Sequence, residues 1–351
     1  MLLSLDMEES ALDIISKEPK YRINQLHQAW FNADINGYDD ISTFPLELRE
    51  KLKAFPWLTM KAKKMEISRK DGTIKALLEL SDGLFIESVL MGREKKGKEN
   101  ELRHTICISS QVGCAMGCVF CATGRLGFRR NLKTEEIIDQ CRFWQNYLFK
   151  ESKASVDNIV IMGQGEPFLN YENIKDAINI VLKNTSIGPS KITLSTVGNK
   201  IGMEKILGDK EFPPIRIAIS LHSAVEETRK IIVPSHQEKF LTWLPEWSKK
   251  YHKIFGSRAH FISLEYVMLA GINDDEKHLK ALIKLASKLG NMRINLIPWN
   301  ELPFEGLKGS PEETIKNWQK KITDKGFICT VRHSQGIDIS AACGQLANKV
   351  K

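Results

Sequence analysis

Long apolar runs are missing from this sequence of 351 residues. No stretch approaches the ~18 consecutive apolar residues of a membrane-spanning helix, so we expect no membrane association. The opening MLLSLDMEES has no basic segment and carries acidic residues at once, which is atypical of a signal peptide. Internal repeats and low-complexity tracts are absent too, and the length suggests about two globular domains.

The sequence also lacks the even-numbered, spread-out cysteines of a disulfide-rich secreted protein. There are seven cysteines, and three of them fall within the run CAMGCVFC. An odd and clustered set does not suggest a disulfide framework. It fits a protein of the reducing cytoplasm, which is the location we expect.

The three clustered cysteines, Cys114, Cys118 and Cys121, have the spacing CxxxCxxC with no fourth cysteine close by. Three thiolates on one loop can hold three irons of a [4Fe-4S] cluster and leave the fourth iron open. A structural zinc site has four protein ligands, usually in CxxC pairs. Zinc binding and three unrelated buried cysteines remain alternatives. The spacing resembles that of radical S-adenosylmethionine enzymes, in which this molecule chelates the open iron.

Positive charge is in excess, with a formal net charge of +8 and a pI near 9.0, which favours an anionic partner. Basic residues are dense at 61–64, 92–104 and 124–133. Any one of these runs can be an ordinary solvated surface. Two of them flank the cysteine run, which indicates that a phosphate backbone approaches the same site.

From residue 104 onward, strand-like and helix-like segments alternate in six βα units. The strands are expected at Thr105–Ser109, Asn158–Met162, Lys191–Ser195, Ile215–Ser220, Phe261–Met268 and Arg293–Ile297, and a last helix leads to a final strand at Phe327–His333. Such alternation predicts a parallel sheet with right-handed crossovers. Six units are too few for an eight-stranded barrel. We therefore predict an α/β protein with a partial, open (β/α)6 barrel over residues 104–351.

Two smaller regions precede the predicted barrel. Residues 1–60 are expected to form a helical accessory domain, since apolar residues recur at helical spacing in 21–32. This domain is also expected to bind RNA. Residues 61–103 are expected to form a β-hairpin extension. Its strand-like runs are joined by Asp71-Gly72 and Asp82-Gly83, a strong hairpin signal, and Glu87 should lie in mid-strand.

Glycine and small polar residues recur at the ends of the predicted barrel strands. In barrel folds the active-site residues lie at the C-terminal ends of the strands. The residues concerned are Gly165 and Glu166 after the second strand, Ser195 after the third, Ser220, Leu221 and His222 after the fourth, and Asn300 after the sixth. Gly165 and Glu166 could receive the amino group of S-adenosylmethionine, and the serines its ribose or carboxylate. A tight turn, helix N-caps and a structural histidine are the plainer explanations.

The C-terminal run GIDISAACGQL contains Cys343 among small residues, so its thiol can be reached. Cys107 lies on the first barrel strand, seven residues before Cys114, and so near the proposed cluster. Both could instead be small buried hydrophobes. We interpret Cys141 and Cys329 as small buried hydrophobic residues, because both lie within apolar patterns.

Together these motifs resemble the radical S-adenosylmethionine RNA methyltransferases that modify carbon 2 of adenine in 23S ribosomal RNA. The resemblance runs from about Tyr21 to Leu346 through TICISSQVGCAMGCVFCA, GEP, SLH, INLIPWN and DISAACGQL, in that order. It implies a barrel of the radical S-adenosylmethionine type. The departure is Gln164, where the family usually has methionine, and it bears on the packing of that turn.

The resemblance also implies a role for each candidate residue. Cys114, Cys118 and Cys121 are expected to hold the cluster. Gly165, Glu166, Ser195, Ser220, Leu221, His222 and Asn300 are expected to line the S-adenosylmethionine site. Cys343 is expected to carry the methyl group, Cys107 to resolve the adduct through a disulfide bond, and Glu87 to accept the C2 proton.

The implied reaction uses two molecules of S-adenosylmethionine per turnover. One methylates Cys343, and the other yields the 5′-deoxyadenosyl radical that activates this methyl group for addition to C2. The expected partners are 23S rRNA, the tRNA adenosine beside the anticodon, and an external electron donor such as flavodoxin. The enzyme is expected to act as a monomer.

Two other functions remain open from the sequence. The sister branch of the family methylates C8 of the same adenine and shares the cysteines, although Pro298-Trp299-Asn300 and Glu166-Pro167 favour the C2 branch. A non-catalytic RNA-binding module with zinc held by the cysteine run and Cys107 is the alternative from a different class.

Overall fold

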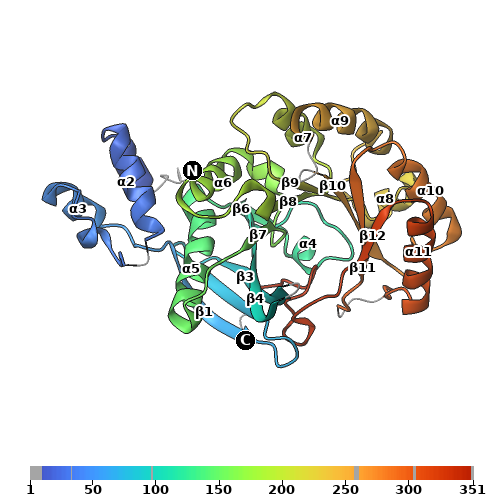
Figure 1. Cartoon of the computed structure of the whole chain (residues 1–351), viewed down its shortest axis with the longest axis horizontal. Coiled ribbons are helices and arrows are strands. Elements are labelled where there is room, and N and C mark those ends of the chain that lie inside the picture. The colour runs from blue at the N-terminus through green and yellow to red at the C-terminus, as the bar shows by residue number, and fades with distance from the viewer. Residues whose placement is uncertain (1–9, 33, 96–97, 257–260, 303–305, 349–351) are drawn as a thin grey trace, which may run out of the picture.

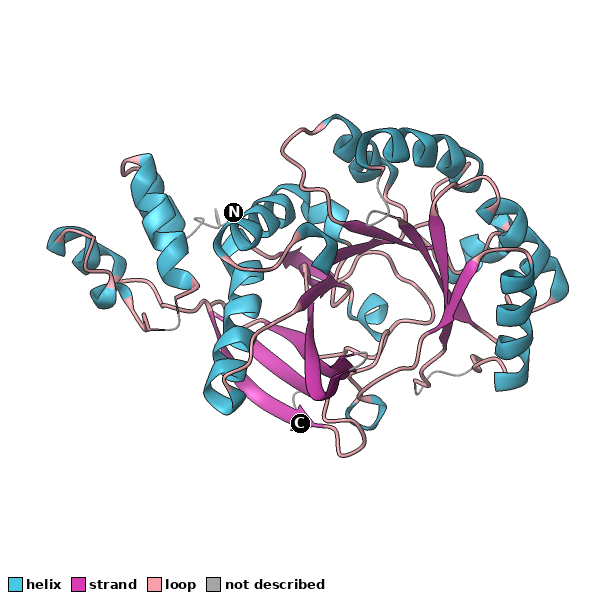
Figure 2. Ribbon diagram, viewed as in Figure 1, coloured by secondary structure: helices cyan, strands magenta, loops and turns pink. Residues whose placement is uncertain are grey.

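The fold is an open barrel with helices on its outer side and a smaller helical region attached at one edge (Figures 1 and 2). It is seen in a computed structural model that describes residues 10–32, 34–95, 98–256, 261–302 and 306–348. A single sheet of ten strands, in the order β1-β2-β3-β4-β7-β8-β9-β10-β11-β12, forms the barrel wall and its extension. Among the described helices none is both long and apolar enough to cross a membrane.

The barrel part of this sheet consists of parallel strands. They are β4 (Lys98–Ile108), β7 (Asn158–Ile161), β8 (Ile192–Thr196), β9 (Arg216–Ser220), β10 (Ile262–Met268), β11 (Met292–Pro298) and β12 (Ile328–Val331). The helices between them are α5 (Thr134–Ser152), α6 (Tyr171–Asn184), α7 (Lys200–Gly208), α8 (Glu226–Ile232), α9 (Phe240–Phe255), α10 (Glu276–Ala286) and α11 (Glu312–Asp324). The predicted partial barrel is confirmed, with β12 as a seventh parallel strand.

Apolar periodicity explains how these elements pack. All seven residues of β10 are buried, as expected for a parallel strand covered on both faces. The helices instead bury one stripe. In α10 this stripe includes Leu279, Leu282 and Leu285, at the spacing of one helix face. The resulting core lies between sheet and helices, which leaves the ends of the strands free for a site.

The extension is an antiparallel meander of β1 (Met60–Ile67), β2 (Ile74–Leu80) and β3 (Phe85–Lys95). Its two turns contain Gly72 and Gly83 at φ +71° and +77°, the left-handed region that glycine favours. Glu87 lies on β3 as predicted, but near the start of the strand and not at its middle, opposite Leu77.

The extension and the barrel share one sheet, because β3 pairs antiparallel with β4. In this register Val89 faces Cys107 across the two strands. The division expected between residues 103 and 104 falls inside β4, so the chain has no break in hydrogen bonding there. The loop after β12 also returns to β3, where Arg93 donates to the His333 carbonyl (3.2 Å) and Gln335 donates to the Gly92 carbonyl (2.9 Å).

The N-terminal region consists of α1 (Ala11–Ser16), α2 (Lys20–Trp30), η1 (Tyr38–Asp40) and α3 (Leu46–Leu52), and in Figure 1 much of it stands apart from the barrel. Its first nine residues lie outside the described part of the chain, as does most of the segment assessed for a signal peptide. The buried Arg142 of α5 attaches this region. Its guanidinium donates to the Trp30 carbonyl (3.2 Å) and lies 4.6 Å from the ring centre of Trp57.

Candidate active site

The cysteine loop follows β4 and is framed by β5 (Gln111–Gly113), α4 (Ala122–Leu126) and β6 (Phe128–Asn131). Two backbone hydrogen bonds shape it, from Cys114 N–H to the Gly127 carbonyl (3.0 Å) and from Cys121 N–H to the Cys118 carbonyl (3.1 Å). Gly124 packs so closely that a Cβ there would lie 3.0 Å from the Cys118 backbone. The three cysteines are therefore held on one compact turn.

The three thiols influence one another electrostatically. Burial and, to a smaller extent, the charge of Cys121 together raise the pKa of the Cys114 thiol to about 11. Burial also raises the pKa of Cys118 far above its usual range, with added contributions from Cys121 and Cys114. Three thiolates so close together, with Cys118 buried and the other two partly buried, need a compensating positive charge, which a metal cluster provides.

Among the described residues, no three His, Cys, Asp or Glu side chains converge on a single metal-ion position. A [4Fe-4S] cluster does not require such convergence, because each thiolate binds a different iron. The compact loop and its coupled thiols fit such a cluster. A closed zinc site would require four ligands around one point.

A buried cation lies behind the same loop. Arg229 of α8 is 1% exposed, and its charge lowers the pKa of the Cys118 thiol. Its guanidinium donates to the carbonyls of Leu221 (3.0 Å) and Val197 and contacts His236 Nδ1 (2.5 Å). The burial of Arg229 beside the cysteine loop was not predicted from the sequence, because a single arginine in an amphipathic helix is normally expected on the solvent-exposed face.

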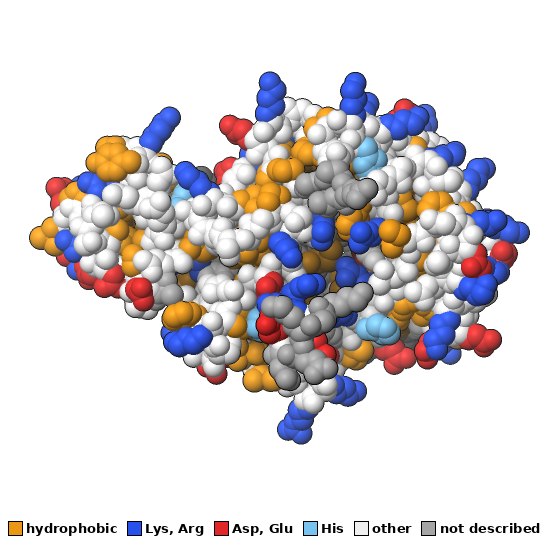
Figure 3. Space-filling model, viewed as in Figure 1, with side chains coloured by type: hydrophobic (Ala, Val, Ile, Leu, Met, Phe, Trp, Pro, Cys, Tyr) orange, Lys and Arg blue, Asp and Glu red, His pale blue; other side chains and the backbone are white. Residues whose placement is uncertain are grey.

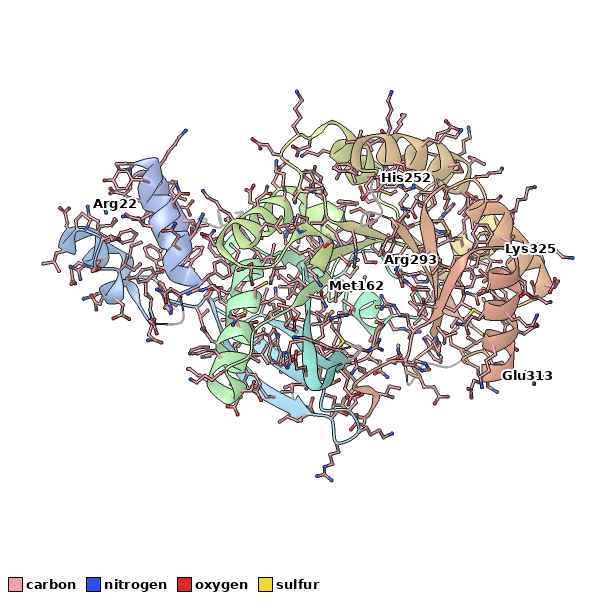
Figure 4. All side chains as sticks on the ribbon, viewed as in Figure 1. Arg22, Met162, His252, Arg293, Glu313 and Lys325 are labelled. Carbon is pink, nitrogen blue, oxygen red and sulfur yellow. The ribbon has the colours of Figure 1, made fainter. Side chains whose placement is uncertain are left out.

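A cavity of about 340 Å³ opens inside the barrel next to the cysteine loop. The predicted residues that line it are Cys107, Cys121, Gly165, Glu166, Ser195, Ser220, His222, Asn300 and Cys343. Met162, at the end of β7, also lines it and lies in the middle of the barrel in Figure 4. The structure thus gathers strand ends, cysteine loop and C-terminal segment around one space. Leu221, Glu87, Cys114 and Cys118 lie outside this lining.

The turn after β7 is built around Glu166. Its carboxylate accepts backbone hydrogen bonds from Val197 (2.8 Å) and Phe168 (3.1 Å). Burial raises the pKa of Glu166 to about 7 despite these donors. Gly165 has φ +104°, and a Cβ there would lie 2.6 Å from Ser110 Oγ, so only glycine fits. A cationic ligand in the cavity would favour the ionised form of Glu166.

Two predicted serines meet on neighbouring strands. Ser195 Oγ of β8 and Ser220 Oγ of β9 are 3.0 Å apart. Next to them His222 has φ +58°, and its Nδ1 accepts a hydrogen bond from Val267 N–H (3.1 Å). Burial lowers the pKa of His222 to about 3, so its imidazole is neutral. These groups present hydroxyls and a neutral ring to a ligand. Leu221 contributes through its backbone, which bonds to β10 and Arg229.

The C-terminal segment lies against the cysteine loop. Ala122 N–H donates to the Gly344 carbonyl (2.7 Å), and Asn300 Nδ2 donates to the Cys343 carbonyl (3.0 Å). Cys343 is exposed because it faces the cavity, while the surrounding protein raises the pKa of its thiol. Burial raises the pKa of Cys107 to about 12, with a further contribution from Cys343. Both thiols line the same cavity.

Glu87 is engaged by three residues at the edge of this arrangement. Its carboxylate is 2% exposed and lies 3.2 Å from Lys75 Nζ. The second carboxylate oxygen accepts backbone hydrogen bonds from Ala347 (2.6 Å) and Asn348 (3.1 Å). The end of the C-terminal segment therefore occupies the carboxylate on which the predicted proton transfer depends.

Gln164 takes part in the same contact. Its side-chain amide donates to Asn348 Oδ1 (2.6 Å), and Asn348 Nδ2 donates to the Phe85 carbonyl (2.7 Å). The departure from the family pattern at position 164 therefore adds a polar link to the tail. Neither Asn348 nor this link was predicted from the sequence.

Glu265 is the clearest site residue that sequence reasoning missed. It lines the cavity from β10, and its carboxylate accepts from Ser263 Oγ (2.9 Å) and Asn295 Nδ2 (2.7 Å). The available signal was an acidic residue within the otherwise apolar run ISLEYVM. A buried charge of this kind is seldom kept for packing alone.

Comparisons with known proteins agree with this geometry. The sequence profile of the Radical SAM superfamily matches residues 108–283. A "Probable dual-specificity RNA methyltransferase RlmN" of Microcystis aeruginosa is 38% identical over 95% of this chain and 94% of its own length. A protein with the same description from Chlorobium phaeobacteroides is 38% identical over 95% of this chain and 90% of its own. The crystal structure of a radical SAM methyltransferase from Sphaerobacter thermophilus superposes with a TM-score of 0.85 at 30% identity, covering 97% of this chain and 98% of that one.

Proposed function

Because the chain belongs to the family of radical S-adenosylmethionine RNA methyltransferases, we propose that it methylates carbon 2 of an adenine in 23S rRNA and of the adenosine beside the tRNA anticodon. The observation that carries this proposal is the meeting of Cys107 and Cys343 in one cavity with the cysteine loop. A simple polar methyltransferase has no need for two such thiols.

The chemistry of the target explains why this arrangement is needed. Carbon 2 of adenine has a C–H bond and no lone pair, so it cannot attack a methyl sulfonium. When bound, the [4Fe-4S] cluster and S-adenosylmethionine supply the methyl group and a 5′-deoxyadenosyl radical. Cys114, Cys118 and Cys121 are the residues that would hold the cluster. The two demands on S-adenosylmethionine imply two molecules per turnover.

The residues around the cavity divide the remaining tasks. Ser195, Ser220 and Asn300 offer hydrogen bonds to the ribose or carboxylate of S-adenosylmethionine, and Glu166 receives its amino group. Cys343 carries the methyl group to the base. The tight turns at Gly165 and His222 hold these groups in place.

The carboxylate of Glu87 and the thiol of Cys107 act in the last steps of the reaction. Glu87 accepts the C2 proton, which requires the amides of Ala347 and Asn348 to release its carboxylate. Cys107, as a thiolate, would then attack the sulfur of Cys343, so that an S–S bond forms while the bond between this sulfur and the methylene carbon breaks. The carbon would keep the electron pair and take up a proton, which completes the methyl group and frees the base. An external electron donor such as flavodoxin would supply the electron that forms the 5′-deoxyadenosyl radical, and a two-electron thiol reductant would return both cysteines to thiols. We propose that the enzyme works as a cytoplasmic monomer.

The identity of the modified base tests the proposal. Ribosomal RNA and tRNA are incubated with the reconstituted enzyme, S-adenosylmethionine and a reductant, and the nucleosides are analysed by mass spectrometry and NMR. We expect an adenosine with a methyl group on C2 in both RNAs. A methyl group on C8 would assign the chain to the sister branch. Recovery of zinc and no methylation would favour the RNA-binding module.

A further inference from the structure

We propose that Arg93 and Arg332 form a clamp for the phosphates that flank the target adenosine, at the mouth of the cavity that holds Cys343. This inference rests on the proposed function, because it assumes that an RNA base enters this cavity. It goes further in naming the residues that bind the backbone of the extruded nucleotide.

The two arginines reach the cavity from opposite ends of the sheet. Arg93 lies on β3 and Arg332 directly follows β12, and both are exposed residues that line the cavity. The hydrogen bond from Arg93 to the His333 carbonyl (3.2 Å) ties the two segments together. Arg93 is therefore held at the cavity before RNA arrives. Figure 3 shows Lys and Arg side chains gathered near the middle of this face.

Neither guanidinium forms an ion pair with a carboxylate within the described part of the chain. The two acidic residues that line the cavity are engaged elsewhere, Glu166 by backbone N–H groups and Glu265 by Ser263 and Asn295. Two unpaired cations at a cavity mouth favour an anionic ligand. The charge of Arg332 also lowers the pKa of the Cys343 thiol, so this arginine is close to the methyl-carrying residue.

The shape of a nucleotide fits this arrangement. An adenine that enters the cavity leaves its phosphates outside, because they are joined to the neighbouring nucleotides. The planar fork of a guanidinium matches the oxygens of a phosphate, which a lysine ammonium does not. The clamp would thus hold a nucleotide by its backbone whatever its neighbours in sequence, which suits an enzyme with two different RNA substrates.

The test is a double-mutant cycle between protein and RNA. Anticodon stem–loop RNA carries a neutral methylphosphonate on the 5′ or the 3′ side of the target adenosine, and its affinity is measured by fluorescence anisotropy. For the wild-type protein we expect one of these substitutions to weaken binding on the order of tenfold. Arg332→Gln and Arg93→Gln should each weaken binding of unmodified RNA similarly and lower the salt slope by about one. The matching methylphosphonate should then have no additional effect.

Three comparisons decide the outcome. Arg103→Gln removes a charge from the register partner of Arg93 that does not line the cavity, and should leave the methylphosphonate effect intact. Arg332→Lys should restore little, because it keeps the charge and loses the fork. RNA affinities of both arginine variants equal to that of the wild type would overturn the clamp. Weaker S-adenosylmethionine binding in place of weaker RNA binding would overturn it as well. Wild-type enzyme that methylates no adenine would instead refute the proposed function.

Discussion

Cysteines reach the cavity from two regions of the molecule that are held in different ways. The cysteine loop is local, with three thiols on a turn fixed by its own backbone and by Gly124. The pair of Cys107 and Cys343 is formed by segments from the two ends of the barrel sequence. One thiol belongs to β4, and the other depends on the hydrogen bonds of Ala122 and Asn300 to the C-terminal segment.

This difference indicates how the two regions can fail. A change in the cysteine loop affects the three thiols that we propose to anchor the cluster, so it should stop every later step. A change in the pair leaves the loop intact and should stop the reaction at one defined point. Variants of single cysteines can therefore separate anchoring from methyl transfer.

Cys118→Ala should have the largest effect. Cys118 is the most buried of the three loop thiols, and three thiolates are the minimum that can anchor the cluster. We expect loss of iron, sulfide and the brown chromophore after anaerobic reconstitution, and no methylation of RNA. Cys141→Ala, in a buried cysteine away from the cavity, serves as the control and should retain iron. A full iron content in Cys118→Ala would contradict the cluster assignment.

Cys343→Ala should abolish methyl transfer to RNA while the cluster remains. The segment is held through its backbone, so removal of the thiol should not release it. We expect wild-type iron content, normal S-adenosylmethionine binding by calorimetry and no methylated adenosine. Product at the wild-type rate would mean that Cys343 is only a packing residue.

Cys107→Ala should interrupt the last step alone. The carbon–carbon bond should still form, but no thiol is left to release the base from Cys343. We expect a covalent protein–RNA species, seen as a slow, nuclease-sensitive band on a denaturing gel. Cys329→Ala provides the matched control with a second non-cavity cysteine. Free turnover of Cys107→Ala without a trapped species would place Cys107 among the structural cysteines.

Glu166→Gln should have the smallest effect of the four substitutions: it should remove one pH-dependent contribution to the free energy of unfolding. Its folded-state pKa of about 7 is above the usual value of 4.5, so the folded protein binds the proton more tightly than the unfolded chain. The stabilisation is thus complete below about pH 4.5 and is lost as the pH rises through about 7, by roughly 3 kcal/mol. Unfolding of the cluster-free protein in urea between pH 5 and 8 should show this loss for the wild type. A glutamine variant with the same pH dependence would show that another group is responsible.

The parts of the fold that depend on local pattern could be predicted from the sequence. Apolar runs of strand length that alternate with amphipathic helices predicted the barrel. The strand predicted at Ile215–Ser220, for example, is β9 at Arg216–Ser220. The two Asp-Gly turns indicated the antiparallel pairing of β1, β2 and β3. The cluster site could be predicted without any knowledge of the fold, because the CxxxCxxC spacing alone is informative.

Contacts between distant segments could not be predicted in this way. Nothing local to Glu87 indicates that Ala347 and Asn348 bind its carboxylate, and nothing local to Arg229 indicates that it is buried behind Cys118. The continuity of β3 with β4 is likewise a property of strand pairing, which a single strand does not reveal. The roles of Cys343 and Cys107 came from family resemblance, and the structure supplies the common cavity.

The hydrogen bonds of Asn348 have a practical consequence for handling this protein. Asn348 contacts Glu87, Phe85 and Gln164, only three positions before the end of this sequence. A purification tag fused to that end would be attached almost directly to the cavity wall, and a truncation after Leu346 would remove the amides that hold Glu87. Affinity handles for spectroscopy or RNA capture therefore belong at the other terminus, because α1, the first described helix, does not line the cavity.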